Sequence, residues 1–167
     1  MMDLPVLVID DEPAVVAFVR AALERSGYAV FAVSSGAEAL DSLKKRNFRG
    51  VISDMRTPGG ITGADVHTWL AANRPELAAR VVFITGDIVN EETRRLLGAT
   101  GAPCLEKPFR VQQLLSAVQE TFGSGCASEQ PITSQPAEGP AAKRAGNRSE
   151  RSSEHEPIVV SRPVRPL

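Results

Sequence analysis

The sequence predicts an α/β fold, a doubly wound sheet of five parallel strands with helices on both faces. Short apolar runs alternate along the chain with segments whose apolar residues recur at helical spacing. Strands that alternate with helices in this way usually form a mostly parallel sheet covered on both sides. The chain has 167 residues, of which 43% are hydrophobic, and this is enough to build one ordinary core.

Five apolar runs are the predicted strands, and each is short enough for a single strand. They are Val6–Ile9, Ala29–Val33, Val51–Ile52 with its flanks, Val81–Ile84 and Ala102–Leu105.

The first helix is expected directly after the first strand. Pro13 suits its first turn, and the carboxylates before Pro13 complement the helix dipole. The second helix is expected to begin at Ser35, because Ser35 and Glu38 have the spacing of a capping box. The apolar face of the first helix consists of Val15, Val16, Val19, Ala22 and Leu23.

Three more helices complete the predicted alternation. Val66, Trp69 and Leu70 share one face of the third helix. Asn90 is the expected N-cap of the fourth helix, whose apolar stripe is weak because it contains little beyond Leu96 and Leu97. The face of the last helix consists of Val111, Leu114, Leu115, Val118 and Phe122.

The composition changes sharply after Phe122. Every aromatic residue lies at or before Phe122, whereas six of the twelve prolines follow it. Residues 124–167 are therefore predicted to be a disordered tail, since they have too little apolar surface to offset the entropy of ordering the chain. We expect one domain over residues 1–123, with a single late apolar patch at Pro157–Pro166 as a candidate docking motif.

Charge and composition exclude several classes of protein. The net charge is −1 and the pI about 6.1, so no nucleic-acid footprint is expected. No apolar run is long enough to span a bilayer and no leader pattern is present, which predicts a cytoplasmic protein without a membrane partner. The two cysteines, Cys104 and Cys126, fit neither a disulfide framework nor a metal knuckle.

Polar groups stand at the ends of four predicted strands. The first strand runs into Asp10 and Asp11, the third ends at Asp54, the fourth at Thr85, and the fifth near Lys107. In open parallel sheets, ligands bind at the carboxyl ends of the strands. A strand must end somewhere, but four such endings together indicate a shared site.

These groups suit phosphoryl chemistry. Three close carboxylates repel one another unless a cation lies among them, and Mg²⁺ prefers oxygen ligands. A metal ion, the Thr85 hydroxyl and the Lys107 ammonium together offer one partner for each of three phosphoryl oxygens. A carboxylate can itself be the nucleophile, and Asp54 is the best candidate because it stands alone, one strand away from the acidic pair.

Four motifs follow one another along the chain: VLVIDDEP, VISDMRTPG, VFITGD and CLEKPF. In this order and at this spacing, they make residues 4–122 resemble a response-regulator receiver domain of two-component signalling. The resemblance implies the flavodoxin-like fold of receivers. It also implies that Asp54 accepts phosphate from a phosphohistidine of a sensor histidine kinase or a histidine phosphotransfer protein.

The same resemblance implies the remaining roles in the site. Mg²⁺ would be bound by Asp11, Asp54 and the backbone carbonyl of Arg56, with Asp10 acting through a water molecule. Thr85 would be the switch hydroxyl and Lys107 the phosphate-binding amine. Pro108 would follow a cis peptide bond, as in the family.

The chain departs from the family pattern at two places. Cys104 stands where the family usually has Tyr or Phe, three residues before the lysine, and Thr57 replaces the common Met before the loop proline. Because the aromatic switch side chain is missing, we expect the output to depend on movement of the loop after Thr85. Arg56 and Asp87 lie where side chains can line the phosphoryl site; we expect solvated charges, with pairing across the site as the alternative.

Taken together, the motifs predict a stand-alone receiver that acts by protein contact or by passing phosphate onward, and not a turnover enzyme. The stretch TGAPCLEKPF resembles receivers appended to hybrid sensor kinases, and weak dimerisation is left open. One alternative is a pseudo-receiver that is never phosphorylated, against which the intact set of site residues argues. The other is a phosphohydrolase with an aspartyl nucleophile, but Arg56 occupies the place of the second acid that such enzymes use.

Overall fold

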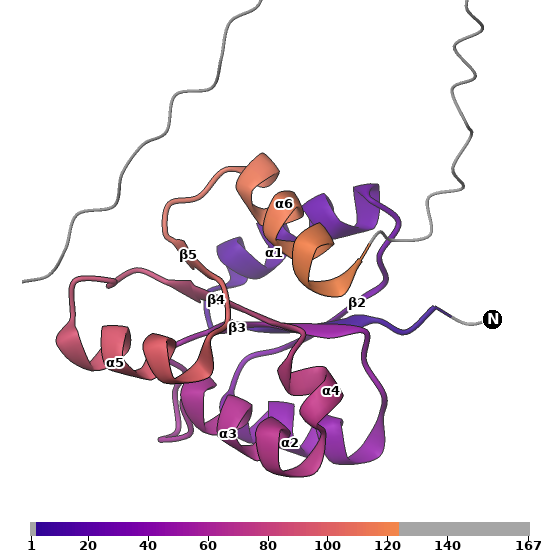
Figure 1. The fold of residues 1–167 in the computed structure, drawn as a ribbon. Helices are drawn as coiled ribbons and strands as arrows, with labels where there is room; N and C mark the ends of the chain where they lie inside the picture. Colours follow the sequence, from indigo (N-terminus) through magenta and orange to yellow (C-terminus); the bar gives the residue numbers. More distant parts are fainter. Residues whose placement is uncertain (1–2, 124–167) are drawn as a thin grey trace, which may run out of the picture. The chain divides into compact units, whose positions relative to one another are not determined.

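A computed structural model of the protein describes residues 3–123, in which five strands form one parallel sheet (Figure 1). The strand order is β2-β1-β3-β4-β5, and all four neighbouring pairs are parallel. The predicted fold class is therefore confirmed. The strands are β1 Val6–Ile9, β2 Val30–Val33, β3 Gly50–Asp54, β4 Val81–Thr85 and β5 Cys104–Glu106.

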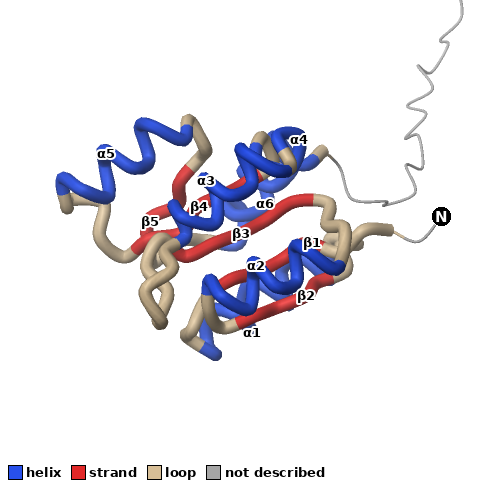
Figure 2. Tube along the Cα trace, turned by 90° about the horizontal axis from the view of Figure 1, so that it is seen from below, coloured by secondary structure: helices blue, strands red, loops and turns tan. Residues whose placement is uncertain are grey.

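Helices cover both faces of the sheet. Helices α1 and α6 lie on one face, and α2, α3 and α4 lie on the other, with α5 beside them (Figure 1). In the turned view of Figure 2, α2 and α3 lie in front of the strands. The helices are α1 Pro13–Arg25, α2 Gly36–Lys45, α3 Gly63–Asn73, α4 Pro75–Ala78, α5 Glu91–Thr100 and α6 Val111–Phe122.

Two apolar clusters, one on each face, form the core. Successive side chains of a strand point to opposite faces of the sheet. Val6 and Val8 of β1 accordingly contribute to the cluster beneath α1 and α6, while Leu7 and Ile9 contribute to the cluster beneath α2 and α3. Each of the five apolar runs of the sequence thus contributes side chains to both clusters.

The predicted helix starts are confirmed with one correction. Pro13 occupies the first turn of α1, and the Asn90 side chain accepts a hydrogen bond from the Glu92 N–H at the start of α5. Ser35 caps α2 by accepting from the Glu38 N–H. The capping box expected there is not completed, because the Glu38 carboxylate accepts from the N–H of Ser34, one residue earlier.

The structure departs from the predicted helices in two respects. Helix α4 was not predicted, because its four residues are too few to show a helical period; Pro75 begins it directly after α3. Val111 lies on the predicted apolar face of α6 but is exposed. The weak apolar stripe of α5 is confirmed: Thr93 is its buried residue, and Leu96 and Leu97 are partly buried.

Other sequence predictions fall beyond this part of the chain. The predicted tail of residues 124–167, its apolar patch and Cys126 lie outside the described residues. Within residues 3–123, no helix is both long enough and apolar enough to cross a membrane.

Candidate phosphoryl-transfer site

The carboxyl ends of β1 and β3 bring the first two acids together. Strand β1 lies between β2 and β3 in the sheet, so the chain crosses over at this point, where open α/β sheets bind ligands. Asp10 follows β1 and Asp54 is the last residue of β3. Both are buried, with 3% and 8% of their surface exposed, so each charge needs a partner within the protein or a bound cation.

Lys107 supplies a cation at the centre of this group. Its Nζ lies 3.0 Å from Asp10 Oδ2, 2.9 Å from Asp54 Oδ2 and 2.8 Å from Glu12 Oε1. The structure therefore brings together Asp10, Asp54 and Lys107, as the sequence predicted. Glu12 had no predicted role in this site; its place in the motif VLVIDDEP, directly after the two aspartates, was the available signal.

Burial and pairing act in opposite directions on these charges. Burial raises the pKa of Asp10, while a hydrogen bond from the Glu12 N–H and the nearby Lys107 lower it in part. For Lys107, burial alone would lower the pKa. Hydrogen bonds to Glu12 and Asp54, together with the ion pair to Asp10, outweigh it and raise the pKa above its ordinary value. Lys107 therefore remains a cation.

The second oxygen of Asp54 is held by the backbone. Asp54 Oδ1 accepts a hydrogen bond of 3.0 Å from the Arg56 N–H. Close packing beneath the acid fixes its position further. A Cβ on Gly63 would lie 2.3 Å from the Asp54 carbonyl oxygen, so a residue without a side chain is needed where α3 begins.

Thr85 stands at the end of the neighbouring strand β4. It is buried, and its hydroxyl accepts a 3.2 Å hydrogen bond from the Asp87 N–H. Its carbonyl accepts a 2.8 Å bond from the Lys107 N–H, which ties the ends of β4 and β5 together. The switch hydroxyl and the amine expected to bind phosphate thus come from adjacent strands, and the Lys107–Pro108 peptide is cis as expected.

Arg56 and Asp87 form an ion pair across the two loops that follow β3 and β4. Arg56 Nη2 lies 3.3 Å from Asp87 Oδ2, and the two side chains are 66% and 45% exposed. The favoured expectation, that the two charges are only solvated, is therefore wrong: they pair, which was the alternative, although both side chains remain largely exposed to solvent. The sequence could not decide between them, because the conformations of both loops determine the distance.

The acidic group has the chemistry of a magnesium site. One oxygen each of Asp10, Glu12 and Asp54 lies within 4.8 Å of the others, and carboxylate oxygens are ligands that Mg²⁺ prefers. Among the described residues, Asp10 Oδ2 is a buried side-chain atom without a hydrogen-bond partner of good geometry. These residues fit a divalent cation. Asp11, the predicted direct ligand, is exposed and lines a hollow between α1 and β2 with Asp10.

Cys104 is half-buried in β5 and packs against the core beneath α3. Burial, together with the charges of Asp54 and Glu106, raises the pKa of its thiol to about 11. The side chain is therefore a neutral core group at the position where the family usually has an aromatic ring.

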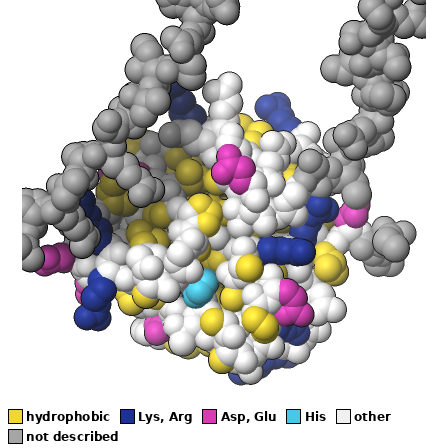
Figure 3. Space-filling view, in the orientation of Figure 1, with side chains coloured by type: hydrophobic (Ala, Val, Ile, Leu, Met, Phe, Trp, Pro, Cys, Tyr) yellow, Lys and Arg dark blue, Asp and Glu magenta, His cyan; other side chains and the backbone are white. Residues whose placement is uncertain are grey.

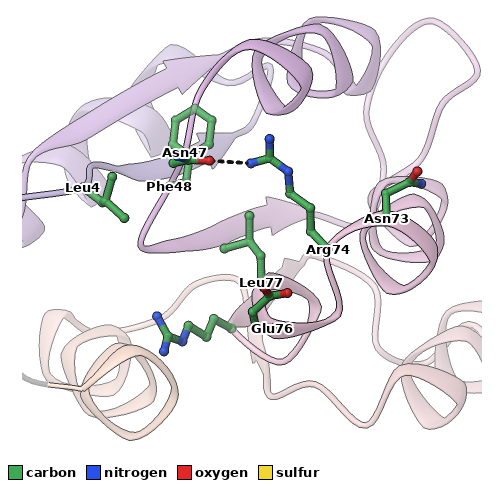
Figure 4. A pocket seen from close by; sticks show the side chains of 8 residues that line it. Leu4, Asn47, Phe48, Asn73, Arg74, Glu76 and Leu77 are labelled. Atoms are coloured by element: carbon green, nitrogen blue, oxygen red, sulfur yellow. Dashed lines mark hydrogen bonds between the residues drawn. The ribbon is translucent and has the colours of Figure 1, made fainter.

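A hollow of about 400 Å³ lies at the amino ends of the strands, opposite the candidate site (Figure 4). It is found where strands begin, since Leu4 precedes β1, Phe48 precedes β3 and Arg80 precedes β4. Arg74 crosses it to donate a 3.1 Å hydrogen bond to Asn47 Oδ1. The residues described around this hollow include none of the predicted site residues.

Known proteins match both the sequence and the fold. The transcriptional regulatory protein FixJ of Azorhizobium caulinodans is 36% identical over 120 residues, covering 72% of this chain and 56% of FixJ. The sensor protein GacS of Pseudomonas syringae is 29% identical over 128 residues, covering 75% of this chain and 14% of GacS. A response regulator receiver protein from Sinorhizobium medicae has a TM-score of 0.64 and 29% identity, covering 72% of this chain and 95% of that one.

The chain thus spans little more than half of FixJ and a small part of GacS. The response regulator receiver domain matches residues 6–119, which include all the strands and most of α6. Because this match covers more than half of the chain, it establishes the family. The protein belongs to the response regulator receiver domain family of two-component signalling systems.

Proposed function

We propose that the protein is a phosphoacceptor receiver in which Asp54 takes a phosphoryl group from a phosphohistidine. The observation that carries this proposal is the surroundings of Asp54: a buried carboxylate between the Lys107 ammonium and the Arg56 N–H, beside a second buried acid. The family membership of the chain supports it.

The reaction joins an Asp54 carboxylate oxygen to phosphorus as the P–N bond to the histidine breaks, and the electron pair of that bond stays on the imidazole nitrogen. Lys107 lies 2.9 Å from Asp54 and is placed to neutralise a phosphoryl oxygen. The Thr85 hydroxyl can donate to another. A magnesium ion held by Asp54 and Asp10, with Asp11 or Glu12 and the Arg56 carbonyl, would supply further charge neutralisation.

The partner we propose is a sensor histidine kinase or a histidine phosphotransfer protein. Similarity to the sensor histidine kinase GacS supports a receiver of the hybrid-kinase kind, and similarity to the transcriptional regulatory protein FixJ supports a receiver with a regulatory role. We place the receiver domain in residues 1–123 and the protein in the cytoplasm. Its action is by protein contact or onward transfer, without catalytic turnover.

Other binding modes are not part of the proposal. We expect no nucleic-acid or membrane partner and leave weak self-association open. On the face drawn in Figure 3, basic side chains lie at separate places among acidic and apolar ones, which supports the view that the partner is a protein.

Incubation with acetyl phosphate and Mg²⁺ tests the proposal. We expect one stable phosphoryl group per chain, detected by intact-protein mass spectrometry, and its loss in Asp54→Asn. Asp41→Asn is the matched control, because Asp41 is an exposed carboxylate paired with Lys45 on α2. Absence of labelling would indicate a pseudo-receiver, steady phosphate release a phosphohydrolase, and full labelling of Asp54→Asn a different acceptor.

A further inference from the structure

The Arg56–Asp87 ion pair connects the two loops that leave the reacting strands. Arg56 lies in the loop between β3 and α3, and Asp87 in the loop between β4 and α5. Each partner is also bound to a reacting residue through its own backbone: the Arg56 N–H donates to Asp54 Oδ1, and the Asp87 N–H donates to Thr85 Oγ1. The ion pair therefore completes a continuous series of polar contacts between Asp54 and Thr85.

Asp87 extends this path to helix α5. Its Oδ1 accepts a 3.2 Å hydrogen bond from the N–H of Asn90, and Asn90 is the N-cap of α5. The segment it holds is loosely packed, since Val89 is 79% exposed and Thr93 is the buried residue of α5. The Asn90–Asp87 hydrogen bond thus ties the start of α5 to the loop after β4, so a change at Asp87 can reach this helix.

A phosphoryl group on Asp54 would compete for Arg56. It carries nearly two negative charges and three acceptor oxygens, against the single exposed carboxylate of Asp87. Guanidinium groups bind phosphate in a forked geometry that favours the exchange. Because the backbone of Arg56 is already hydrogen-bonded to Asp54, its side chain is within reach of a group bonded to that carboxylate.

We infer that the Arg56–Asp87 ion pair is a latch that phosphorylation of Asp54 opens. Arg56 exchanges Asp87 for phosphoryl oxygens, and Asp87 releases the loop Gly86–Asn90 and the start of α5. This inference rests on the proposed function and gives the receiver a means of output in place of the aromatic side chain that Cys104 replaces. The partner that reads the phosphorylated state would bind the released loop.

The first test needs no phosphoryl group. Arg56→Gln and Asp87→Asn each break the ion pair, and asparagine keeps an oxygen that can accept from the Asn90 N–H. Backbone NMR should show the same Gly86–Asn90 amide shifts in both variants, and the double variant should add nothing further. Asp41→Asn should leave these amides unchanged. Loop amides that stay at their wild-type positions in both variants would overturn the latch.

The second test uses beryllofluoride with Mg²⁺ as a phosphoryl mimic. Asp87→Asn frees Arg56 beforehand, so the mimic should bind about two- to five-fold tighter, the range expected for an exposed ion pair. Arg56→Gln should weaken binding. Asp87→Asn made in the Arg56→Gln background should give no tightening, because there is no guanidinium to release.

The outcomes separate the latch from the function on which it rests. If Asp87→Asn increased the affinity for beryllofluoride equally with and without Arg56, the cause would be the loss of a negative charge near the site. That result would overturn the latch. No binding of the mimic to a chain with Asp54 intact would count against the proposed function; the latch would then be judged by the loop amides of the first test alone.

Discussion

The two sides of the site are packed differently. On the acceptor side, which we define as β3 and α3, every residue of β3 is buried, and Gly63 at the start of α3 touches the Asp54 backbone. On the switch side, which we define as β4, the loop Gly86–Asn90 and α5, the strand is equally buried, but its loop exposes Val89 and its helix buries little more than Thr93.

This difference in packing suits two different functions, holding a reacting group in place and responding to phosphorylation. The proposed nucleophile, Asp54, would need a fixed position relative to a metal and to the Lys107 cation, and close packing supplies that position. A segment that responds to phosphorylation must move at low energetic cost, and elements with few buried contacts open most easily. The fold therefore presents the proposed acceptor from a closely packed strand and helix start, and the proposed switch hydroxyl beside a helix with few buried residues.

The largest expected effect contrasts two glycines. Gly63→Ala should destabilise the protein by about 2 to 3 kcal/mol, because its Cβ would meet the Asp54 carbonyl and backbone must move. Gly98→Ala in α5 should instead stabilise it by about 0.5 to 1 kcal/mol, since alanine favours helix and no atom lies within 4 Å of the added Cβ. Urea unfolding of both variants measures the contrast.

Phosphorylation should separate the same two variants. Gly63→Ala should also label slowly with acetyl phosphate, because the displaced backbone carries Asp54, whereas Gly98→Ala should label at the wild-type rate. Equal stability changes of the same sign in the two variants would contradict the difference in packing on which the comparison depends.

An intermediate effect is expected from Mg²⁺. A ligand that binds only the folded state stabilises it by mass action, by about 1.4 kcal/mol at ten times its dissociation constant. Mg²⁺ should therefore raise the melting temperature, and Asp10→Asn should remove most of the increase, since Asp10 belongs to the acidic group.

Two further variants show which carboxylate completes the metal site. The family resemblance predicts Asp11 as a ligand, whereas the structure places Glu12 within the acidic group. Loss of the Mg²⁺ response in Asp11→Asn but not in Glu12→Gln would require the Asp11 side chain to turn toward Asp54 on binding. The reverse result would identify Glu12 as the ligand, and a full response in all three variants would refute the site.

The sequence predicted what depends on residue pattern. The apolar runs gave β1 without error, and placed the other strands to within one or two residues, because burial on both faces leaves an unbroken apolar run. Asp10, Asp54, Thr85 and Lys107 were predictable because parallel strands deliver their carboxyl ends to one edge. Each of these residues lies within two positions of the end of its strand.

What the sequence missed depends on local geometry. The contact of Glu12 with Lys107 and the Arg56–Asp87 pair both depend on how loops direct long side chains, for which no residue period exists. At Ser35, the capping box is incomplete by a single residue: the Glu38 carboxylate accepts from the N–H of Ser34 instead of the N–H of Ser35. Thr62 and Asp65 form a complete capping box at α3, which was not predicted.

The smallest expected effect concerns the pH response of the acceptor side. His67 of α3 lies against the buried Phe83, with ring centroids 5.9 Å apart, and burial lowers its pKa, although a hydrogen bond with the Ala78 backbone raises it in part. As the pH is lowered through the unfolded pKa of about 6.5, the unfolded chain therefore binds more protons than the folded one. The free energy of unfolding decreases as the pH is lowered. Urea unfolding between about pH 5 and pH 8 should show this loss, and His67→Gln should reduce it, whereas an unchanged pH profile would mean that the packing around α3 admits the charged ring.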